Sequence, residues 1–148
     1  MEIAILGLGC FWGPEIKFSK LDGVIKTEVG YCGGHNSETN YKEVCTGSTN
    51  HAEVVKLDFD PKIISYEKIL KFFFEIHDPT TLNSQGPDFG TQYRSEIFCL
   101  NNFQKAKAEK VLQEVNQKLS GKVVTKVSLL KNYSPAEEYH QMYLKKNR

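Results

Sequence analysis

The chain carries its most chemically suggestive residues near the start, in the segment Gly9-Cys10-Phe11-Trp12-Gly13. This segment joins an apolar, strand-like run to a helix start that is marked by Pro14. A thiol in the first turn of a helix faces the positive end of the helix dipole, which lowers the pKa of the thiol. We therefore predict a reactive thiolate at Cys10 beside an aromatic wall. A buried cysteine within an aromatic core is the alternative, because free cysteines are often buried.

A carboxylate on an apolar strand face is the second chemical signal. In the alternating run over residues 51–59, Glu53 shares a face with the apolar side chains at positions 55, 57 and 59. Burial of a charged carboxylate is unfavourable, so the pKa of Glu53 should rise until the group holds a proton near neutral pH. Such a group serves as a general acid. A strand-end glutamate that turns toward solvent is the alternative.

Periodicity and capping signals predict the elements that must hold these groups. Alternation of apolar residues predicts strands, amphipathic spacing predicts helices, and Ser65 is expected to be a helix N-cap. The expected strands span residues 3–8, 24–31, 51–59, 94–100 and 123–130. The expected helices span residues 13–21, 65–77 and 102–119, with a terminal helix after the capping box Ser134-Pro135-Ala136-Glu137.

The first six elements follow the β-α-β-β-α-β order of a split βαβ unit. We therefore predict the α+β class, as a ferredoxin-like split β-α-β-β-α-β sandwich with extra C-terminal helices, in a single catalytic domain over residues 1–148. In that topology one edge of the sheet collects the ends of the first four strands, where the residues are Cys10, Tyr31, Glu53 and Tyr93. The long connection over residues 78–93 reaches the same edge, and loops of that length are often functional.

Several longer motifs occur in order along the chain. They are Gly9-Cys10-Phe11-Trp12-Gly13, Tyr31-Cys32-Gly33-Gly34, Glu43-Val44-Cys45-Thr46-Gly47 with His51-Ala52-Glu53-Val54, His77-Asp78-Pro79-Thr80-Thr81-Leu82-Asn83, Gly90-Thr91-Gln92-Tyr93-Arg94-Ser95 and Tyr139-His140-Gln141. Together they resemble the class A peptide methionine sulfoxide reductases. The resemblance spans nearly the whole chain and implies reduction of the S epimer of methionine sulfoxide, free or within proteins.

By matching motif, the resemblance implies a role for each group at the predicted sheet edge. Cys10 is the nucleophile, and Glu53 donates a proton to the sulfoxide oxygen. Tyr31 and Tyr93 hydrogen-bond that oxygen, in the manner of an oxyanion hole. Release of methionine leaves Cys10 as a sulfenic acid.

The resemblance also implies residues that hold the substrate. Phe11 and Trp12 hold its methyl group. Asp88 orders the loop and the substrate amide, and His140 of the Tyr139-His140-Gln141 motif belongs to the same substrate-binding group.

The chain departs from the family in its cysteines. Many members carry resolving cysteines beyond the Tyr-His-Gln motif, whereas this sequence has none after His140. Cys32, beside Tyr31, is a possible resolving thiol; a small side chain that fills a gap at the strand end is the alternative. If Cys32 does not resolve the sulfenic acid, we expect glutathione, glutaredoxin or thioredoxin to do so, with no bound cofactor.

The residues alone leave three other functions as alternatives. Cys32 and Cys45 with His35 and His51 offer two thiols and two imidazoles for a structural zinc ion, although their spacing fits no strong zinc pattern. Cys10 with His140 as its base would make a cysteine hydrolase. A non-catalytic protein could bind methionine-rich segments through its aromatic residues. We expect no metal site.

Composition limits the partners and the compartment. The formal net charge of +1 and the scattered basic residues give no sign of nucleic-acid binding. No signal peptide or membrane-spanning run is recognisable. Four cysteines without disulfide-scaffold spacing indicate reduced thiols, so we expect a cytoplasmic protein.

Overall fold

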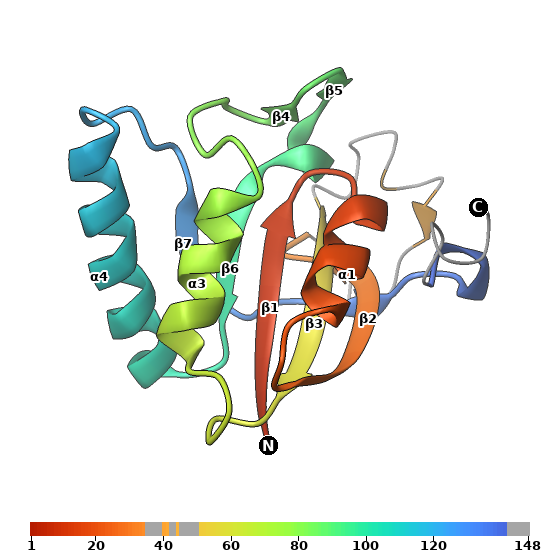
Figure 1. Ribbon diagram of the computed structural model, residues 1–148. Coiled ribbons are helices and arrows are strands. Elements are labelled where there is room, and N and C mark those ends of the chain that lie inside the picture. The colour runs from red at the N-terminus through yellow and green to blue at the C-terminus, as the bar shows by residue number, and fades with distance from the viewer. Residues whose placement is uncertain (35–39, 42–43, 45–50, 142–148) are drawn as a thin grey trace.

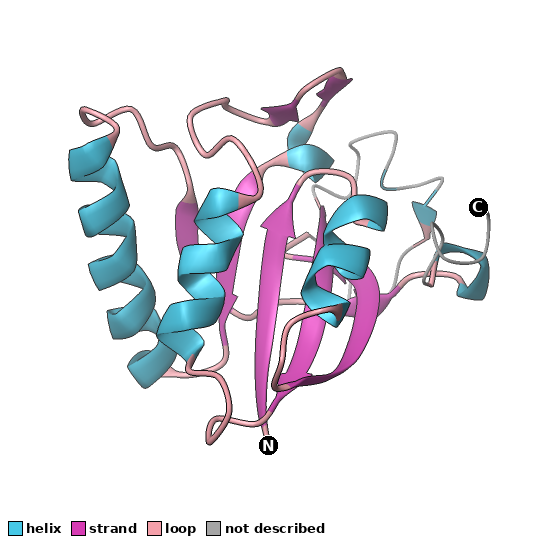
Figure 2. Cartoon of the chain, viewed as in Figure 1, coloured by secondary structure: helices cyan, strands magenta, loops and turns pink. Residues whose placement is uncertain are grey.

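The computed structural model describes residues 1–34, 40, 41, 44 and 51–141 (Figures 1 and 2). Its helices are α1 (Trp12–Ser19), α3 (Tyr66–Glu75) and α4 (Asn102–Lys118), with 3₁₀ turns η1 (Thr91–Tyr93) and η2 (Glu138–His140). Its strands are β1 (Glu2–Leu8), β2 (Val24–Cys32), β3 (Ala52–Phe59), β4 (Ser84–Gln85), β5 (Asp88–Phe89), β6 (Ser95–Cys99), β7 (Lys126–Leu129) and β8 (Ser134–Pro135). The predicted strands and helices up to β7 are confirmed, with small shifts at their ends. None of the helices in these ranges has the length and apolar character that crossing a membrane requires.

One mixed sheet organises the chain, with strands in the order β7-β6-β1-β3-β2-β8. β1 lies between β3 and β6 and is antiparallel to both, β2 is antiparallel to β3 and β8, and β7 runs parallel to β6. The register places Tyr31 of β2 opposite Glu53 of β3. The β1–α1 turn lies at the end of the sheet nearest the β4–β5 hairpin (Figure 1).

The helices cover one face of this sheet (Figure 2). The main core lies between that face and the helices; it includes Phe18 of α1, Phe73 of α3 and Val111 of α4, each fully buried. A second, smaller cluster lies on the opposite face and comprises Ile5, Cys32, Ala52, Val54 and Phe98. Because side chains alternate along a strand, neighbouring residues such as Tyr31 and Cys32 belong to different faces.

Local capping explains where two helices begin. The Ser65 hydroxyl accepts a hydrogen bond from the backbone N–H of Lys68 at 3.1 Å, as predicted, and Asn101 caps α4 through Gln104 in the same way at 2.9 Å. These contacts satisfy backbone donors that the first turn of a helix leaves unpaired.

The predicted terminal helix after Ser134 is wrong for the residues described. Ser134 and Pro135 form the edge strand β8, which pairs with Tyr31 and Gly30 of β2. Gly30 permits this close approach, because a Cβ at that position would lie 2.7 Å from the carbonyl oxygen of Ser134. The open edge of β2 thus overrides a local capping signal, and a short 3₁₀ turn follows at 138–140. Residues 142–148 lie outside the described part.

Candidate active site

Cys10 lies in the turn between β1 and α1, two residues before the helix begins at Trp12. Burial raises the pKa of its thiol to about 11; the backbone N–H of Trp12 opposes this rise, and the carboxylates of Glu53 and Asp88 add to it. The predicted lowering of the Cys10 pKa is therefore wrong. Loss of water around the sulfur outweighs the single N–H that faces it, so the resting thiol keeps its proton.

Glu53 reaches the same turn from β3. Its side chain is 1% exposed, and Oε1 accepts a hydrogen bond from the backbone N–H of Phe11 at 3.4 Å. Within the described residues, Oε2 has no hydrogen-bond partner. Burial raises the pKa of Glu53 to about 8, with Phe11 N–H lowering it and Asp88 raising it. The predicted burial and the raised pKa of this carboxyl are confirmed, and a neutral Glu53 has a proton to donate near Cys10.

Tyr31 is beside Glu53 in the sheet, but its hydroxyl contacts another side chain of the protein instead of facing an open substrate position. It is fully buried, and its hydroxyl donates to Oε1 of Glu137 at 2.9 Å. The other oxygen of Glu137 accepts the backbone N–H of Tyr41 at 3.1 Å. The single hydroxyl proton of Tyr31 is thus engaged in holding Glu137, which in turn holds the backbone of residue 41.

An aromatic wall stands beside the thiol, with His140 at its centre. The Nε1–H of Trp12 donates to Nδ1 of His140 at 3.0 Å, and the Phe11 ring lies 5.3 Å from the His140 ring. Because the indole can only donate, Nδ1 is an acceptor, and a neutral His140 carries its proton on Nε2. That nitrogen is buried and has no hydrogen-bond partner within the described residues. Burial lowers the pKa of His140, so the neutral form predominates, while Glu137 opposes this shift.

Sequence reasoning missed two residues of this site, Tyr41 and Glu137. The Tyr41 ring packs on His140 with centroids 4.6 Å apart. An aromatic residue inside the otherwise polar loop after Cys32 was the available signal for Tyr41. Glu137 was assigned to a helix capping box, which gave it a local role instead of a contact with Tyr31.

The connection over residues 78–93 covers the Cys10 turn. Gln85 of β4 packs on Gly9, where an added Cβ would lie 2.8 Å from its Cβ and Cγ. Its side-chain amide accepts from the N–H of Asp78 at 3.0 Å and donates to the Thr81 hydroxyl at 3.2 Å, which fixes the loop. Asp88 pairs with Gln85 in the β4–β5 ladder. Burial is the main cause of the raised pKa values of Cys10 and Glu53, and the charge of Asp88 adds a smaller rise to both.

Tyr93 closes the same connection. It is half-buried in η1, which packs against β3, the strand of Glu53. The structure therefore draws η1 and the β4–β5 hairpin to the sheet edge that carries the thiol and the carboxyl.

Cys32 belongs to the other face of the sheet. It is fully buried, and its thiol donates to the carbonyl oxygen of Lys131 at 3.3 Å. Burial raises the pKa of Cys32 to about 12, opposed by the backbone contact with Lys131. Cys10, Cys32 and Cys99 are free thiols. Cys45 and His35 of the zinc alternative lie outside the described residues, and within those residues no cluster of three or more ligands could hold a metal ion.

The arrangement combines a protonated thiol, a protonated buried carboxyl and an aromatic wall. A substrate with a basic oxygen on a centre that the sulfur can attack would use all three. A small apolar substituent on that centre would contact the aromatic rings.

The sequence matches known proteins over nearly its whole length. The family described as "Peptide methionine sulfoxide reductase" matches residues 2–148. The peptide methionine sulfoxide reductase MsrA of Pelagibacter ubique is 82% identical over 146 residues, which is 99% of each chain. A probable peptide methionine sulfoxide reductase of Schizosaccharomyces pombe is 50% identical, with 99% of this chain and 90% of that protein covered.

Solved structures show the same mixed α/β fold. The reduced form of Mxr1 from Saccharomyces cerevisiae is 42% identical with a TM-score of 0.95, covering 99% of this chain and 85% of that one. Methionine sulfoxide reductase A of Corynebacterium diphtheriae is 37% identical, also with a TM-score of 0.95, covering 99% of this chain and 74% of that one. The yeast protein in complex with Trx2 is 27% identical with a TM-score of 0.69, covering 96% of this chain and 84% of that one.

Proposed function

Since the chain belongs to the peptide methionine sulfoxide reductase family and reduces methionine sulfoxide at the expense of thiols, we propose that Cys10 is its nucleophile and Glu53 its general acid. The neutral Glu53 gives its proton to the sulfoxide oxygen as the Cys10 sulfur attacks the substrate. The oxygen passes from the substrate sulfur to the Cys10 sulfur, and the thiol proton restores Glu53. The substrate sulfur gains the two electrons that Cys10 loses, which yields methionine and a Cys10 sulfenic acid.

The buried Glu53 carboxyl carries this proposal. Its pKa of about 8 keeps it protonated at neutral pH, and its Oε2 has no hydrogen-bond partner within the described residues. A free carboxyl O–H in a dry site donates strongly to an oxygen that becomes negative. The raised pKa of Cys10 agrees with this proton transfer, because the proton that restores Glu53 is already on the sulfur.

The neighbouring side chains would orient the sulfoxide. We assign the methyl group to Phe11 and Trp12, and the second hydrogen bond to the sulfoxide oxygen to Tyr93. Tyr31 supports the site through Glu137, and its hydroxyl reaches the oxygen only if it leaves that carboxylate. Asp88 of the β4–β5 hairpin is suited to the polar part of the substrate, and so is the Nε2–H of His140, which has no partner among the described residues.

Separate assays of the two epimers test this function. We expect the purified protein to convert methionine-S-sulfoxide, free and in a peptide, to methionine with dithiothreitol as reductant. The R epimer should stay unreacted, because inversion at sulfur directs the oxygen away from Glu53 while the methyl group occupies the aromatic wall. Chiral chromatography of the remaining sulfoxide gives the result. Equal consumption of both epimers would rule out the assigned orientation.

We propose that a thiol from another molecule resolves the sulfenic acid. The free thiol of Cys32 faces the opposite side of the sheet, is fully buried and is bonded to Lys131. A disulfide with Cys10 requires Cα atoms within about 7 Å and facing side chains, which this orientation opposes. The yeast relative that was solved with Trx2 favours a thioredoxin as the physiological reductant, with glutaredoxin or glutathione as the other candidates. A reductant-dependent enzyme with free thiols is suited to the cytoplasm, and its proposed reaction needs no bound cofactor.

Replacement of Cys32 tests this resolution step. We expect Cys32→Ala to keep its steady-state turnover with thioredoxin within about twofold of the wild type, since small changes at buried sites alter stability more than a remote reaction. One equivalent of sulfoxide without reductant should consume one thiol, leaving the others titratable. Loss of two thiols per methionine formed, abolished in Cys32→Ala, would instead show that Cys32 resolves Cys10.

We also propose that residues 1–148 form one catalytic domain with a ferredoxin-like core. The order β6-β1-β3-β2, antiparallel throughout, supports this description, with β7 and β8 as additions at the two edges. The main core supports a single domain, because it extends from Ala4 to Ala136.

A further inference from the structure

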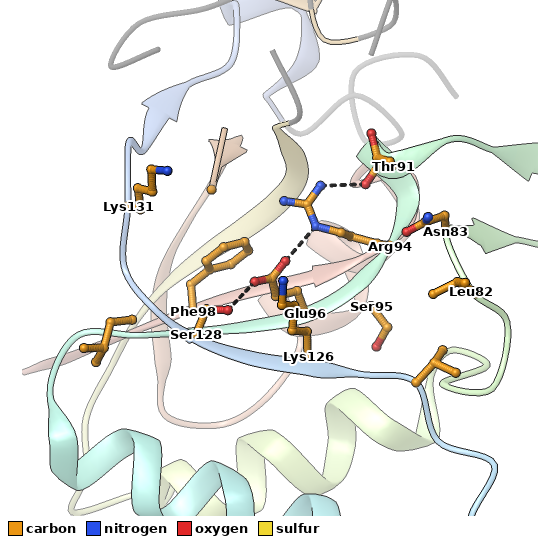
Figure 3. Close-up of a pocket in the computed structure, with 13 residues that line it drawn as sticks. Leu82, Asn83, Thr91, Arg94, Ser95, Glu96, Phe98, Lys126, Ser128 and Lys131 are labelled. Carbon is orange, nitrogen blue, oxygen red and sulfur yellow. Dashed lines mark hydrogen bonds and ion pairs between the residues drawn. The ribbon is translucent and has the colours of Figure 1, made fainter. Parts of the chain in front are cut away.

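A cavity of about 500 Å³ lies on the sheet face opposite the helices (Figure 3). Phe98 and Glu96 of β6 line it, whereas their neighbour Ile97 belongs to the core on the helix side. Its lining shares Leu82, Asn83 and Thr91 with the connection over residues 78–93, but it includes none of the side chains assigned above to the Cys10 site. The volume lies in the range typical of small-molecule sites. The cavity is therefore distinct from the proposed reductase site, but it borders the connection that carries Asp88 and Tyr93.

Glu96 is the one carboxylate among the described residues of the cavity lining, and each of its two oxygens accepts a hydrogen bond. Oε1 of Glu96 accepts from Nε of Arg94 at 2.6 Å, and Oε2 accepts from the Ser128 hydroxyl at 2.6 Å. The Glu96 side chain is 5% exposed, so little of it faces the open space. Arg94 also donates through one amino group to the carbonyl of Thr91 at 2.8 Å. Arg94, Glu96 and Ser128 thus form a hydrogen-bonded group on this face of the sheet.

Among the described lining residues, cations outnumber that carboxylate. Arg94, Lys126 and Lys131 contribute three positive charges against one negative charge from Glu96, an excess of two within this part of the chain. The second amino group of Arg94 lies toward Gly33, about 3.1 Å from where a Cβ would sit. Both lysines are exposed at the rim, so their ammonium groups remain available to a ligand.

Part of the lining is apolar. Leu82, Val124 and Leu129 line the space and are exposed. The Phe98 ring lies between Lys131 and Arg94 in the view of Figure 3, but only 1% of this residue is exposed, so it supports the cavity from below. A bare inorganic anion would pair with the cations but leave this apolar surface without a contact, so the lining favours a ligand with both an acidic and an apolar part.

We propose that this cavity binds a small organic carboxylate, with its apolar body against the exposed aliphatic side chains of the lining and its carboxylate between Arg94 and the two lysines. The excess of donors over free acceptors selects the anionic group. The exposed aliphatic side chains select an organic body over inorganic phosphate. The proposal does not rest on sulfoxide reduction, since no residue of the Cys10 turn takes part.

Titration of the ¹⁵N-labelled protein with phenylacetate tests the proposal. We expect amide shifts at Gly33, at residues 91–96 and at residues 126–131, together with a rise in melting temperature, because the ligand binds only the folded state. Phenylacetamide, which lacks the charge, and inorganic phosphate, which lacks the apolar body, should each bind more weakly. The reductase assay is not part of the readout, so failure here leaves the reductase proposal untouched.

Paired variants identify the cations. The double variant Lys126→Ala/Lys131→Ala should weaken phenylacetate binding about threefold to tenfold, since exposed ion pairs are individually modest. The control Lys107→Ala/Lys110→Ala removes the same charge from α4 and should leave the affinity unchanged. The proposal is overturned if phenylacetate shifts none of the cavity amides, if phenylacetamide or phosphate binds as tightly, or if the Lys126 and Lys131 variant binds like the wild type.

Discussion

Cys10→Ser should abolish methionine sulfoxide reduction, with a loss on the order of 10⁴-fold or more, as is usual for a lost nucleophile. A serine hydroxyl is a far weaker nucleophile toward sulfur and cannot form the sulfenic acid. The protein should still fold, because Cys10 is only partly buried in a turn outside the main core. Methionine released in a single turnover, with far-UV circular dichroism as the folding check, gives the measurement.

Cys99→Ala is the matched control for this variant. Cys99 is a free thiol in β6 and belongs to the core on the helix side, with its sulfur 4.0 Å from the Tyr66 hydroxyl. Its removal should lower the melting temperature slightly and leave single-turnover reduction intact. If Cys10→Ser retained turnover and Cys99→Ala lost it, the nucleophile would have been assigned to the wrong sulfur.

Glu53→Gln should lower the rate of reduction by about 10²- to 10⁴-fold, the usual contribution of a positioned general acid. The amide has nearly the same shape and can still accept the Phe11 N–H, but it has no acidic proton to transfer. Substrate binding should therefore change little, so the loss should appear in kcat and not in KM. Asp58→Asn, on the polar side of the same strand β3, is the control and should keep wild-type rates.

The pH dependence of the rate separates proton donation from a structural role of Glu53. Its pKa is raised to about 8, so the proton is held below that pH and lost above it. The wild-type single-turnover rate should therefore fall about tenfold per pH unit above that value, as loss of one essential proton requires. Glu53→Gln should lack this alkaline limb. An unchanged limb in the variant would assign it to another group, and a loss under about threefold would show that Tyr93 or water delivers the proton.

Local sequence patterns predicted most of the strands and helices of this molecule and the burial of Glu53. Alternation along β3 predicted that Glu53 faces the core, and from that burial its raised pKa follows, since removal of water penalises the charged form. The apolar run and the Pro14 signal placed Cys10 at a strand-to-helix turn. These features depend on neighbours within a few residues, so periodicity records them.

Contacts between distant segments were beyond the reach of local pattern. The hydroxyl of Tyr31 meets Glu137 across 106 residues, and Trp12 meets His140 across 128. The segment at Ser134 has a helix-capping pattern, yet it pairs with the open edge of β2 because backbone groups there need partners. The pKa of Cys10 is raised where the sequence predicted a lowered value, and the reason is the same. The helix start is a local feature, whereas the burial that dominates comes from strands and loops packed around the thiol. Residue types and spacing therefore led to the reacting groups that we propose, but their protonation and partners depend on which distant segments exclude water from the site.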